Sequence, residues 1–248
     1  GPAQELLLRM ADLEAGEEVL DVACGTGLVT FPAARRVGPR GRVVGPDISQ
    51  GMVDEGMRLA GAAGIGNVRF ERMDAEELDL PDAGFDAALC ALGLMYVPDP
   101  VAALAGMHRV LRPGGRAVAA VWGPRSACGW AEVFPIVDAR VNSEVCPLFF
   151  QLGTGDSLAA GFREAGFEEV VTERISVPLP YDSDDDAGGA AFDGGPVAMA
   201  WSRFDEATRA ECRREYLESI APFRRGGGYE IPGEFVVVRG SKRPVSRF

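Results

Sequence analysis

The chain has 248 residues, a formal net charge of −12 at pH 7 and 47% apolar residues, an ordinary share for a globular protein. Its length fits one α/β domain with insertions, so we expect a single domain over residues 1–248. The acidic charge argues against nucleic acid as a partner, because phosphate contacts need clustered Lys and Arg, and no apolar run approaches the ~18 residues that span a bilayer.

The cysteines indicate a reducing compartment. Their number is odd and no Cys-x-x-Cys pair occurs, which suits free thiols better than disulfides or a zinc site. They are Cys24, Cys90, Cys128, Cys146 and Cys212. The initial Gly1-Pro2 is typical of a protease-cleavage remnant rather than of a secretory leader. We therefore expect a cytoplasmic protein.

A strand, a glycine turn and a helix follow one another near the start of the chain. Residues 19–23 are apolar except for Asp21, which predicts a buried strand. Gly25 and Gly27 carry no Cβ, so the backbone there can turn sharply and approach a ligand. A helix beginning near Leu28 would direct its free N–H groups at that ligand. This arrangement predicts a nucleotide-type pocket.

Two later carboxylates support that pocket. Residues 42–47 form a second predicted strand that ends in Asp47, about 20 residues past the glycine turn, where an acid that binds ribose is expected. Residues 67–74 alternate polar and apolar side chains and end in Asp74. Each acid has a simpler interpretation: Asp47 as the cap of a helix beginning near Ser49, and Asp74 as a loop carboxylate.

The middle of the chain continues the alternation of strands and helices. Residues 84–100 predict a fourth strand and its loop, and Asp99-Pro100 is a strong helix start. The helix leads to the turn at residues 112–115, and a fifth strand is predicted over residues 116–122. Further strands are expected over residues 169–177 and 230–239, the last with Pro232 at its start.

Two insertions, at about residues 124–155 and 181–229, are expected to form a substrate cap. The first carries a predicted helix over residues 129–141, and the second carries a charged helix over residues 205–220. Their aromatic side chains can wall an acceptor pocket, form the insertions' own core, or make a homodimer contact. They include Trp130, Phe134, Phe149, Phe150, Phe192, Met199, Trp201 and Phe204. The acidic run 182–186 predicts a solvated loop rather than a calcium site.

Residues 17–123 and 156–178 resemble the class I S-adenosylmethionine-dependent methyltransferases, in a small-molecule branch similar to the quinone-biosynthesis C-methyltransferases. The resemblance lies in Asp21, the Gly-Thr-Gly turn, the two later acids, the turn at residues 112–115 and the segment 164–167. It implies a Rossmann-like, doubly wound sheet of seven strands in the order 3-2-1-4-5-7-6, the last antiparallel. It implies S-adenosylmethionine as cofactor, S-adenosylhomocysteine as product, and cofactor contacts at Asp21, Ala23, Cys24, Gly25, Gly27, Asp47, Ile48, Met52, Asp74, Ala75, Cys90 and Ala91.

The predicted reaction is direct in-line methyl transfer to a small, apolar or aromatic metabolite, which needs alignment more than a catalytic base. Tyr96, in the loop after the fourth strand, is the catalytic candidate. The sole histidine, His108, is expected at a helix end. No metal is predicted. Two alternatives remain: a non-catalytic relative that binds the cofactor, and an NAD(P)-dependent oxidoreductase, although Thr30 replaces the third glycine of the dinucleotide motif.

Overall fold

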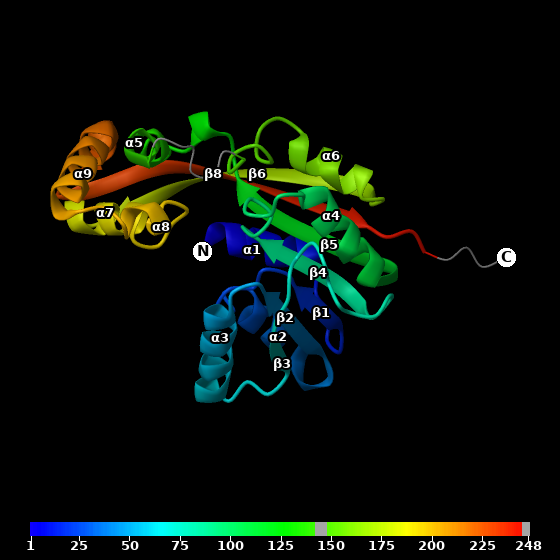
Figure 1. Ribbon diagram of the computed structural model, residues 1–248. Coiled ribbons are helices and arrows are strands. Elements are labelled where there is room, and N and C mark those ends of the chain that lie inside the picture. Colours follow the sequence, from blue (N-terminus) through cyan, green and yellow to red (C-terminus); the bar gives the residue numbers. More distant parts are fainter. Residues whose placement is uncertain (142–147, 245–248) are drawn as a thin grey trace. The chain divides into compact units, whose positions relative to one another are not determined.

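A computed structural model describes residues 1–141 and 148–244 of the chain. Its sheet has the strand order β3-β2-β1-β4-β5-β8-β6, and the two-residue β7 pairs with β8 (Figure 1). Because β7 is only a short addition, the order confirms the predicted 3-2-1-4-5-7-6 arrangement. The strands are β1 Glu18–Asp21, β2 Arg42–Asp47, β3 Val68–Arg72, β4 Phe85–Ala91, β5 Leu111–Trp122, β6 Glu168–Tyr181, β7 Arg224–Arg225 and β8 Gly228–Ser241.

The described residues divide into two compact units. The first comprises residues 1–121, 156–174 and 236–244, and the second comprises residues 122–141, 148–155 and 175–235. Both predicted insertions fall inside the second unit; their role as a substrate cap stays a prediction. Five strands that lie in the first unit, β5 except for its last residue, are parallel: β1 lies between β2 and β4, β3 lies beside β2, and β5 beside β4.

Two helices of the first unit begin at side-chain caps that the sequence supplies. Ser49 Oγ accepts a hydrogen bond from Met52 N, and α3 follows at once. Asp99 Oδ1 accepts from Val101 N and Ala102 N, with Pro100 at the first position of α4, as predicted. The helices are α1 Pro2–Ala11, α2 Thr30–Val37, α3 Gln50–Ala63, α4 Pro100–Val110 and α6 Ser157–Glu164, with a short 3₁₀ helix at Gly38–Arg40.

Hydrogen bonds at two points fix the direction of β8. Gly114 N donates to Lys242 O at 2.9 Å, and Gly123 N donates to Glu234 O at 2.6 Å. The partner number falls as the β5 number rises, so β8 runs antiparallel to β5. The predicted turn at residues 112–115 lies within β5, where the pairing with β4 shifts from Leu111 to Arg116. That strand therefore starts earlier than expected and contains an irregularity.

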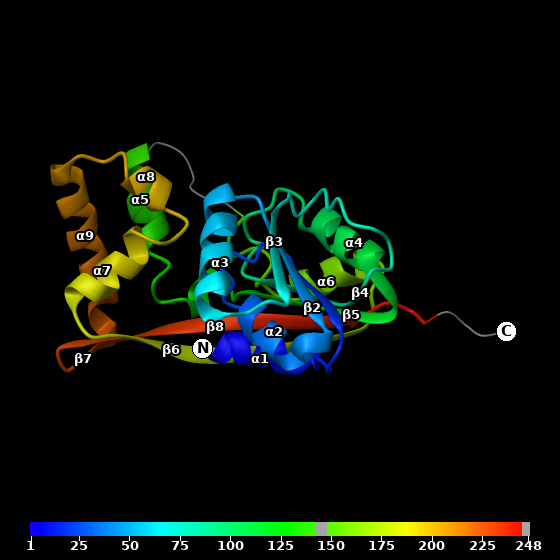
Figure 2. The same ribbon diagram turned by 90° about the horizontal axis from the view of Figure 1, so that it is seen from below.

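The second unit holds the remaining helices, which gather in one group in Figure 2. They are α5 Val133–Val141, α7 Asp184–Phe192, α8 Ala198–Trp201 and α9 Glu206–Ile220, with 3₁₀ turns at Arg125–Ala127 and Ala221–Phe223. Helix α9 and its cap Asp205 agree with the prediction, since Asp205 Oδ1 accepts from Thr208 N.

Two predictions in this unit are wrong. The acidic run is not a loop: Ser183 Oγ accepts from Asp186 N, and the carboxylates after it occupy the first turn of α7, where the helix dipole favours negative charge. Helix α5 begins four residues later than predicted. Gly129 N donates to Pro232 O at 2.8 Å, and this bond to β8 holds Gly129 outside the helix.

Candidate functional site

The carboxyl ends of four neighbouring strands bring most of the predicted cofactor residues together. Asp21 is the last residue of β1 and Asp47 the last of β2, while Asp74 follows β3 by two residues. Cys90 and Ala91 end β4. Because β3, β2, β1 and β4 are adjacent and parallel, these ends share one edge of the sheet, where ligands of open α/β folds bind.

Asp47 ties this edge to the glycine turn. Its Oδ2 accepts a hydrogen bond from Gly25 N at 2.8 Å, and its Oδ1 accepts from Ser49 N at 2.9 Å. The side chain is buried, so these bonds hold it in one orientation. A carboxylate has about four acceptor positions, so two stay available for sugar hydroxyls. Asp47 thus stands two residues before the cap residue Ser49 and is not itself the cap of α3.

Asp21 is fully buried and bonded to the start of α2. Thr30 Oγ1 donates to Asp21 Oδ2 at 2.6 Å, and both side chains are inaccessible to water. Burial raises the pKa of Asp21 from 3.8 to about 7, while the hydrogen bonds from Thr30 lower it. Val29, the N-cap residue of α2, makes no side-chain cap, so Asp21 supplies the acceptor from the neighbouring strand. The sequence analysis did not anticipate this role of Thr30.

The loops after β1 and β4 lie in close contact. Ala23 has φ +53° and Leu92 has φ +63°, a left-handed conformation that is costly for residues with a Cβ. A Cβ added at Gly93 would lie 2.5 Å from Ala23 Cβ and 2.9 Å from Cys90 Sγ. Backbone strain of this kind concentrates at ligand sites.

Apolar side chains beside these acids are open to solvent. Ile48 is 62% exposed, Met52 44% and Leu28 66%. Ile48 directly follows Asp47, Met52 lies in the first turn of α3, and Leu28 follows Gly27. Large apolar side chains that flank buried polar groups form a surface suited to a purine ring.

The two glycines of the turn differ in the space around them. Gly25 has φ +55°, and a Cβ there would meet nothing within 4 Å, so space lies above this backbone. A Cβ at Gly27, φ +98°, would lie 2.7 Å from the Phe31 ring. Gly25 therefore leaves room for a ligand, whereas Gly27 is required by packing against α2. Gln4 of α1 donates to Leu28 O and holds the segment after the turn.

The other predicted residues have mainly local partners. Asp74 Oδ1 accepts from Glu76 N at 2.9 Å, so Asp74 makes an Asx turn next to half-buried Ala75. Burial raises the pKa of the Cys90 thiol to about 12 and raises the pKa of Cys24 as well. Both thiols are therefore protonated at neutral pH and pack as small apolar groups.

Tyr96 and His108 differ in their surroundings. Tyr96 is exposed, and its backbone N–H donates to Gly93 O at 3.0 Å. His108 lies in the last turn of α4 and contacts the Phe167 ring at 4.9 Å between centroids. Partial burial and Lys242 lower the pKa of His108, so it is mostly neutral at pH 7.

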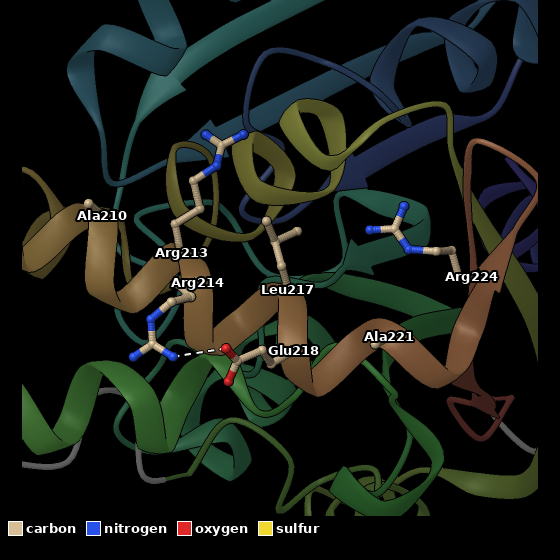
Figure 3. Close-up of a pocket in the computed structure, with 7 residues that line it drawn as sticks. All are labelled: Ala210, Arg213, Arg214, Leu217, Glu218, Ala221 and Arg224. Carbon is tan, nitrogen blue, oxygen red and sulfur yellow. Dashed lines mark hydrogen bonds and ion pairs between the residues drawn. The ribbon is translucent and has the colours of Figure 1, made fainter.

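Elsewhere, the second unit contains a hollow of about 520 Å³ along one face of α9. Figure 3 shows Leu217 between the side chains of Arg213 and Arg224, with the ion pair Arg214–Glu218 nearby. Arg213 and Arg224 pair with the α7 acids Asp185 and Asp184. The arginines are thus neutralised by carboxylates of the same unit, and we assign this hollow no anion-binding role.

Residues 1–141 and 148–244 contain no group of three or more His, Cys, Asp or Glu side chains arranged to hold a metal ion. No helix within the same ranges combines the length and apolar character needed to cross a bilayer. Cys24, Cys90, Cys128 and Cys212 are free thiols, while Cys146 lies outside the described residues.

Comparisons with known proteins agree with this geometry. Residues 19–115 match a family described as a methyltransferase domain. The chain is 30% identical to the nocamycin O-methyltransferase of Saccharothrix syringae, over 98% of this chain and 92% of that enzyme. It is 32% identical to the demethylmenaquinone methyltransferase of Geobacillus kaustophilus, over 67% of this chain and 77% of that enzyme.

A solved structure from Bacillus halodurans C-125, provisionally assigned as a methyltransferase, covers 98% of this chain and 100% of its own with a TM-score of 0.67. At 20% identity it shows the fold alone. The sheet order and the solved neighbour define a Rossmann-like fold, with acids at the carboxyl edge of its parallel strands. The relatives specify it further: the chain belongs to the class I S-adenosylmethionine-dependent methyltransferases. It is an enzyme that uses S-adenosylmethionine as its methyl donor.

Proposed function

We propose that this methyltransferase acts on a small apolar or aromatic metabolite and holds its donor at the carboxyl edge of β1–β4. The observation that carries the donor site is Asp47, a buried carboxylate fixed by Gly25 N and Ser49 N at the end of β2. Its orientation is set by the backbone before any ligand arrives, as a preorganised binding group requires.

The other predicted residues take complementary roles in this proposal. Asp47 accepts hydrogen bonds from the sugar hydroxyls and Asp74 accepts from the purine amino group. Ile48 and Met52 cover the purine, replacing their exposure to water by apolar contact. Ala23, Cys24 and Gly25 supply the backbone of the turn, and Cys90 and Ala91 close the β4 side. Asp21 acts indirectly, by fixing the start of α2 through Thr30.

The donor, when bound, supplies a sulfonium methyl group that is already activated for attack. The protein therefore has to orient the acceptor behind that methyl group and exclude water, and neither task requires a side chain that takes up a proton. Tyr96 is placed in the loop after β4 and serves in this proposal as a contact for the acceptor, not as an indispensable base.

The proposed acceptor class is supported by the net charge of the chain and by the names of its relatives. A net charge of −12 disfavours nucleic acid as acceptor. The two relatives named above have names that refer to nocamycin and demethylmenaquinone, both small molecules. We extend that acceptor class, and a cytoplasmic location, to this chain as part of the proposal. Gel filtration of the purified protein separates a monomer from the homodimer considered above.

Titration calorimetry tests the donor site directly. S-adenosylhomocysteine should bind with one site per chain, and NADH should not bind under the same conditions. Binding of NADH without S-adenosylhomocysteine would contradict the proposal. Turnover is then sought by incubating methyl-labelled donor with a metabolite extract, where label should appear in small organic compounds and not in added RNA or DNA.

A further inference from the structure

Arg72 stands at the carboxyl edge of the sheet and pairs with no carboxylate of residues 1–141 and 148–244. It is the last residue of β3 and the Cα partner of Asp47, the last residue of β2. Met73 N donates to Asp47 O at 3.0 Å, so the two strand ends are held together at this point. The side chain of Arg72 therefore starts directly beside the acid that we assign to the sugar hydroxyls of the methyl donor.

One hydrogen bond directs the Arg72 side chain. Its Nε donates to Ile48 O at 3.2 Å, across the end of β2. Ile48 is one of the two exposed apolar residues that we assign to the purine. The bond holds the guanidinium group next to Ile48 and leaves both terminal nitrogens without a hydrogen-bond or ion-pair partner in the described part of the chain.

Arginines on the same two strands are bonded in a different way. Arg69 of β3 pairs with Glu71, and Arg42 at the start of β2 pairs with Glu18 at 2.9 Å. Their guanidinium groups are thus occupied by carboxylates of the protein. Arg72 is exposed and held by a carbonyl oxygen instead, so its charge and its planar face stay available to a ligand.

The strand order determines which part of the donor lies within reach of Arg72. Along the carboxyl edge, Asp74 follows β3, while Gly25 follows β1 on the other side of β2. A donor whose purine amino group reaches Asp74 has its purine on the β3 side and its amino acid on the side of β1 and β4. Arg72 precedes Asp74 by two residues, so the purine is the part of the donor closest to it.

The chemistry of the guanidinium group suits a neutral aromatic ring at this position. The group is planar, weakly hydrated and attracted to the face of an aromatic ring. A free arginine can also bind a phosphate, but Asp47 and Asp74 lie close to Arg72 along the same edge, and their carboxylates repel an anion. An uncharged purine carries no such penalty.

We propose that Arg72 is a donor-binding residue whose guanidinium plane covers the purine of S-adenosylmethionine beside Ile48 and Met52. The inference rests on the proposed function and extends the donor site from the sugar to the base. No bond forms or breaks at Arg72, because the group contributes contact with the base and no chemistry.

Titration calorimetry with two probes and matched variants tests this assignment. S-adenosylhomocysteine carries both the purine and the amino acid, whereas 5′-methylthioadenosine carries the purine without the amino acid. Arg72→Lys keeps the charge and loses the plane, and Arg72→Met loses both. Arg69→Lys and Arg69→Met are the controls, because Arg69 is an exposed arginine of the same strand that already has an acidic partner.

Both Arg72 variants should bind each probe about three- to tenfold more weakly than the native protein, as expected for the loss of a cation–π contact. Both Arg69 variants should keep the native affinity. Native affinity in Arg72→Lys would show that the plane is not needed and would contradict the inference. A loss for S-adenosylhomocysteine alone would assign Arg72 to the amino-acid end of the donor, which also contradicts it.

Failure of this inference can be distinguished from failure of the donor site. If Asp47→Ala loses S-adenosylhomocysteine while both Arg72 variants retain it, the donor site stands and only the role of Arg72 is wrong. If the native protein does not bind S-adenosylhomocysteine, both are wrong. Because Arg72 and Arg69 are exposed, all of these arginine variants should unfold at the native urea midpoint, which separates lost contact with the base from lost stability.

Discussion

The carboxyl edge of β1–β4 differs from the aromatic cluster around Trp130 in how buried polar atoms are bonded. This cluster is formed by Trp122, Trp130, Phe134, Phe149, Phe150 and Phe235. At the edge, Asp47 and Asp21 each receive hydrogen bonds from the protein itself, so their orientation does not depend on a ligand. In the cluster, Trp130 Nε1 has no partner among the described residues. The difference separates buried polar groups whose orientation is set in advance from a packed aromatic core in which one donor has no partner among the described residues.

The largest expected effect concerns Asp47, the acid that is oriented in advance at the carboxyl edge of the sheet. Asp47→Ala should weaken S-adenosylhomocysteine binding on the order of a hundredfold, since a hydrogen bond to a charged group is worth about 1.5–3 kcal/mol and the turn at Gly25 also loses its anchor. Titration calorimetry measures the loss. Asp54→Ala, which removes an exposed acid of α3, is the matched control. Equal affinities in the two variants would show that Asp47 takes no part in binding.

A second variant tests the close contact between the two loops. Gly93→Ala places a Cβ 2.5 Å from Ala23 Cβ, and we expect a loss of about 1–3 kcal/mol in the free energy of unfolding. Gly61→Ala serves as control, because a Cβ there meets nothing within 4 Å inside α3 and should stabilise the helix by about 0.5–1 kcal/mol. Urea denaturation compares them. A Gly93→Ala protein as stable as the native one would mean that these loops are not packed tightly.

The pH dependence of stability tests the buried acid. The pKa of Asp21 is about 7 in the folded protein against 3.8 as its ordinary value, so between these values the folded chain holds a proton that the unfolded chain has released. The contribution of Asp21 to stability must therefore decrease as pH rises from about 4 to 7, and stay constant above. The difference in unfolding free energy between the native protein and Asp21→Asn, from urea titrations, should fall over this range. If the difference in unfolding free energy does not change with pH, the pKa of Asp21 in the folded protein is an ordinary one.

The smallest effect concerns Tyr96. Because the proposed reaction needs no proton acceptor, Tyr96→Phe should lower kcat less than tenfold with any acceptor found by label transfer. A loss of ~10³ in kcat would identify Tyr96 as a catalytic base or an essential hydrogen-bond donor. The rate would then come mainly from acid–base chemistry and not from alignment of the acceptor.

The sequence was most informative where local chemistry decides the structure. The bounds of β2 and the caps Asp99 and Asp205 agree with the predictions, because strand pattern and capping act over a few residues. Helix α7 was mistaken for a loop, since its acids and glycines are typical of loops. Its first turn is stabilised by Arg224 and Tyr229, which both donate to Asp184 from about 40 positions away.

In the candidate site, too, contacts between residues far apart in the sequence could not be predicted. The strand-end positions of Asp21 and Asp47 could be predicted from the pattern, but the partner of Asp21 could not, because Thr30 is an ordinary residue in sequence. Nor could sequence distinguish Trp130 from Trp201, since partners of an indole N–H depend on packing between distant segments. Polar residues at the start of a helix that follows a glycine turn are the signal that would have identified Thr30.

A crystal structure of the complex with S-adenosylhomocysteine tests the central claim most directly. We predict the ribose hydroxyls within hydrogen-bond distance of Asp47, and the purine amino group at Asp74 with its ring against Ile48 and Met52. A nucleoside lying at any other edge of the sheet, with Asp47 still bonded only to Gly25 and Ser49, would contradict the account.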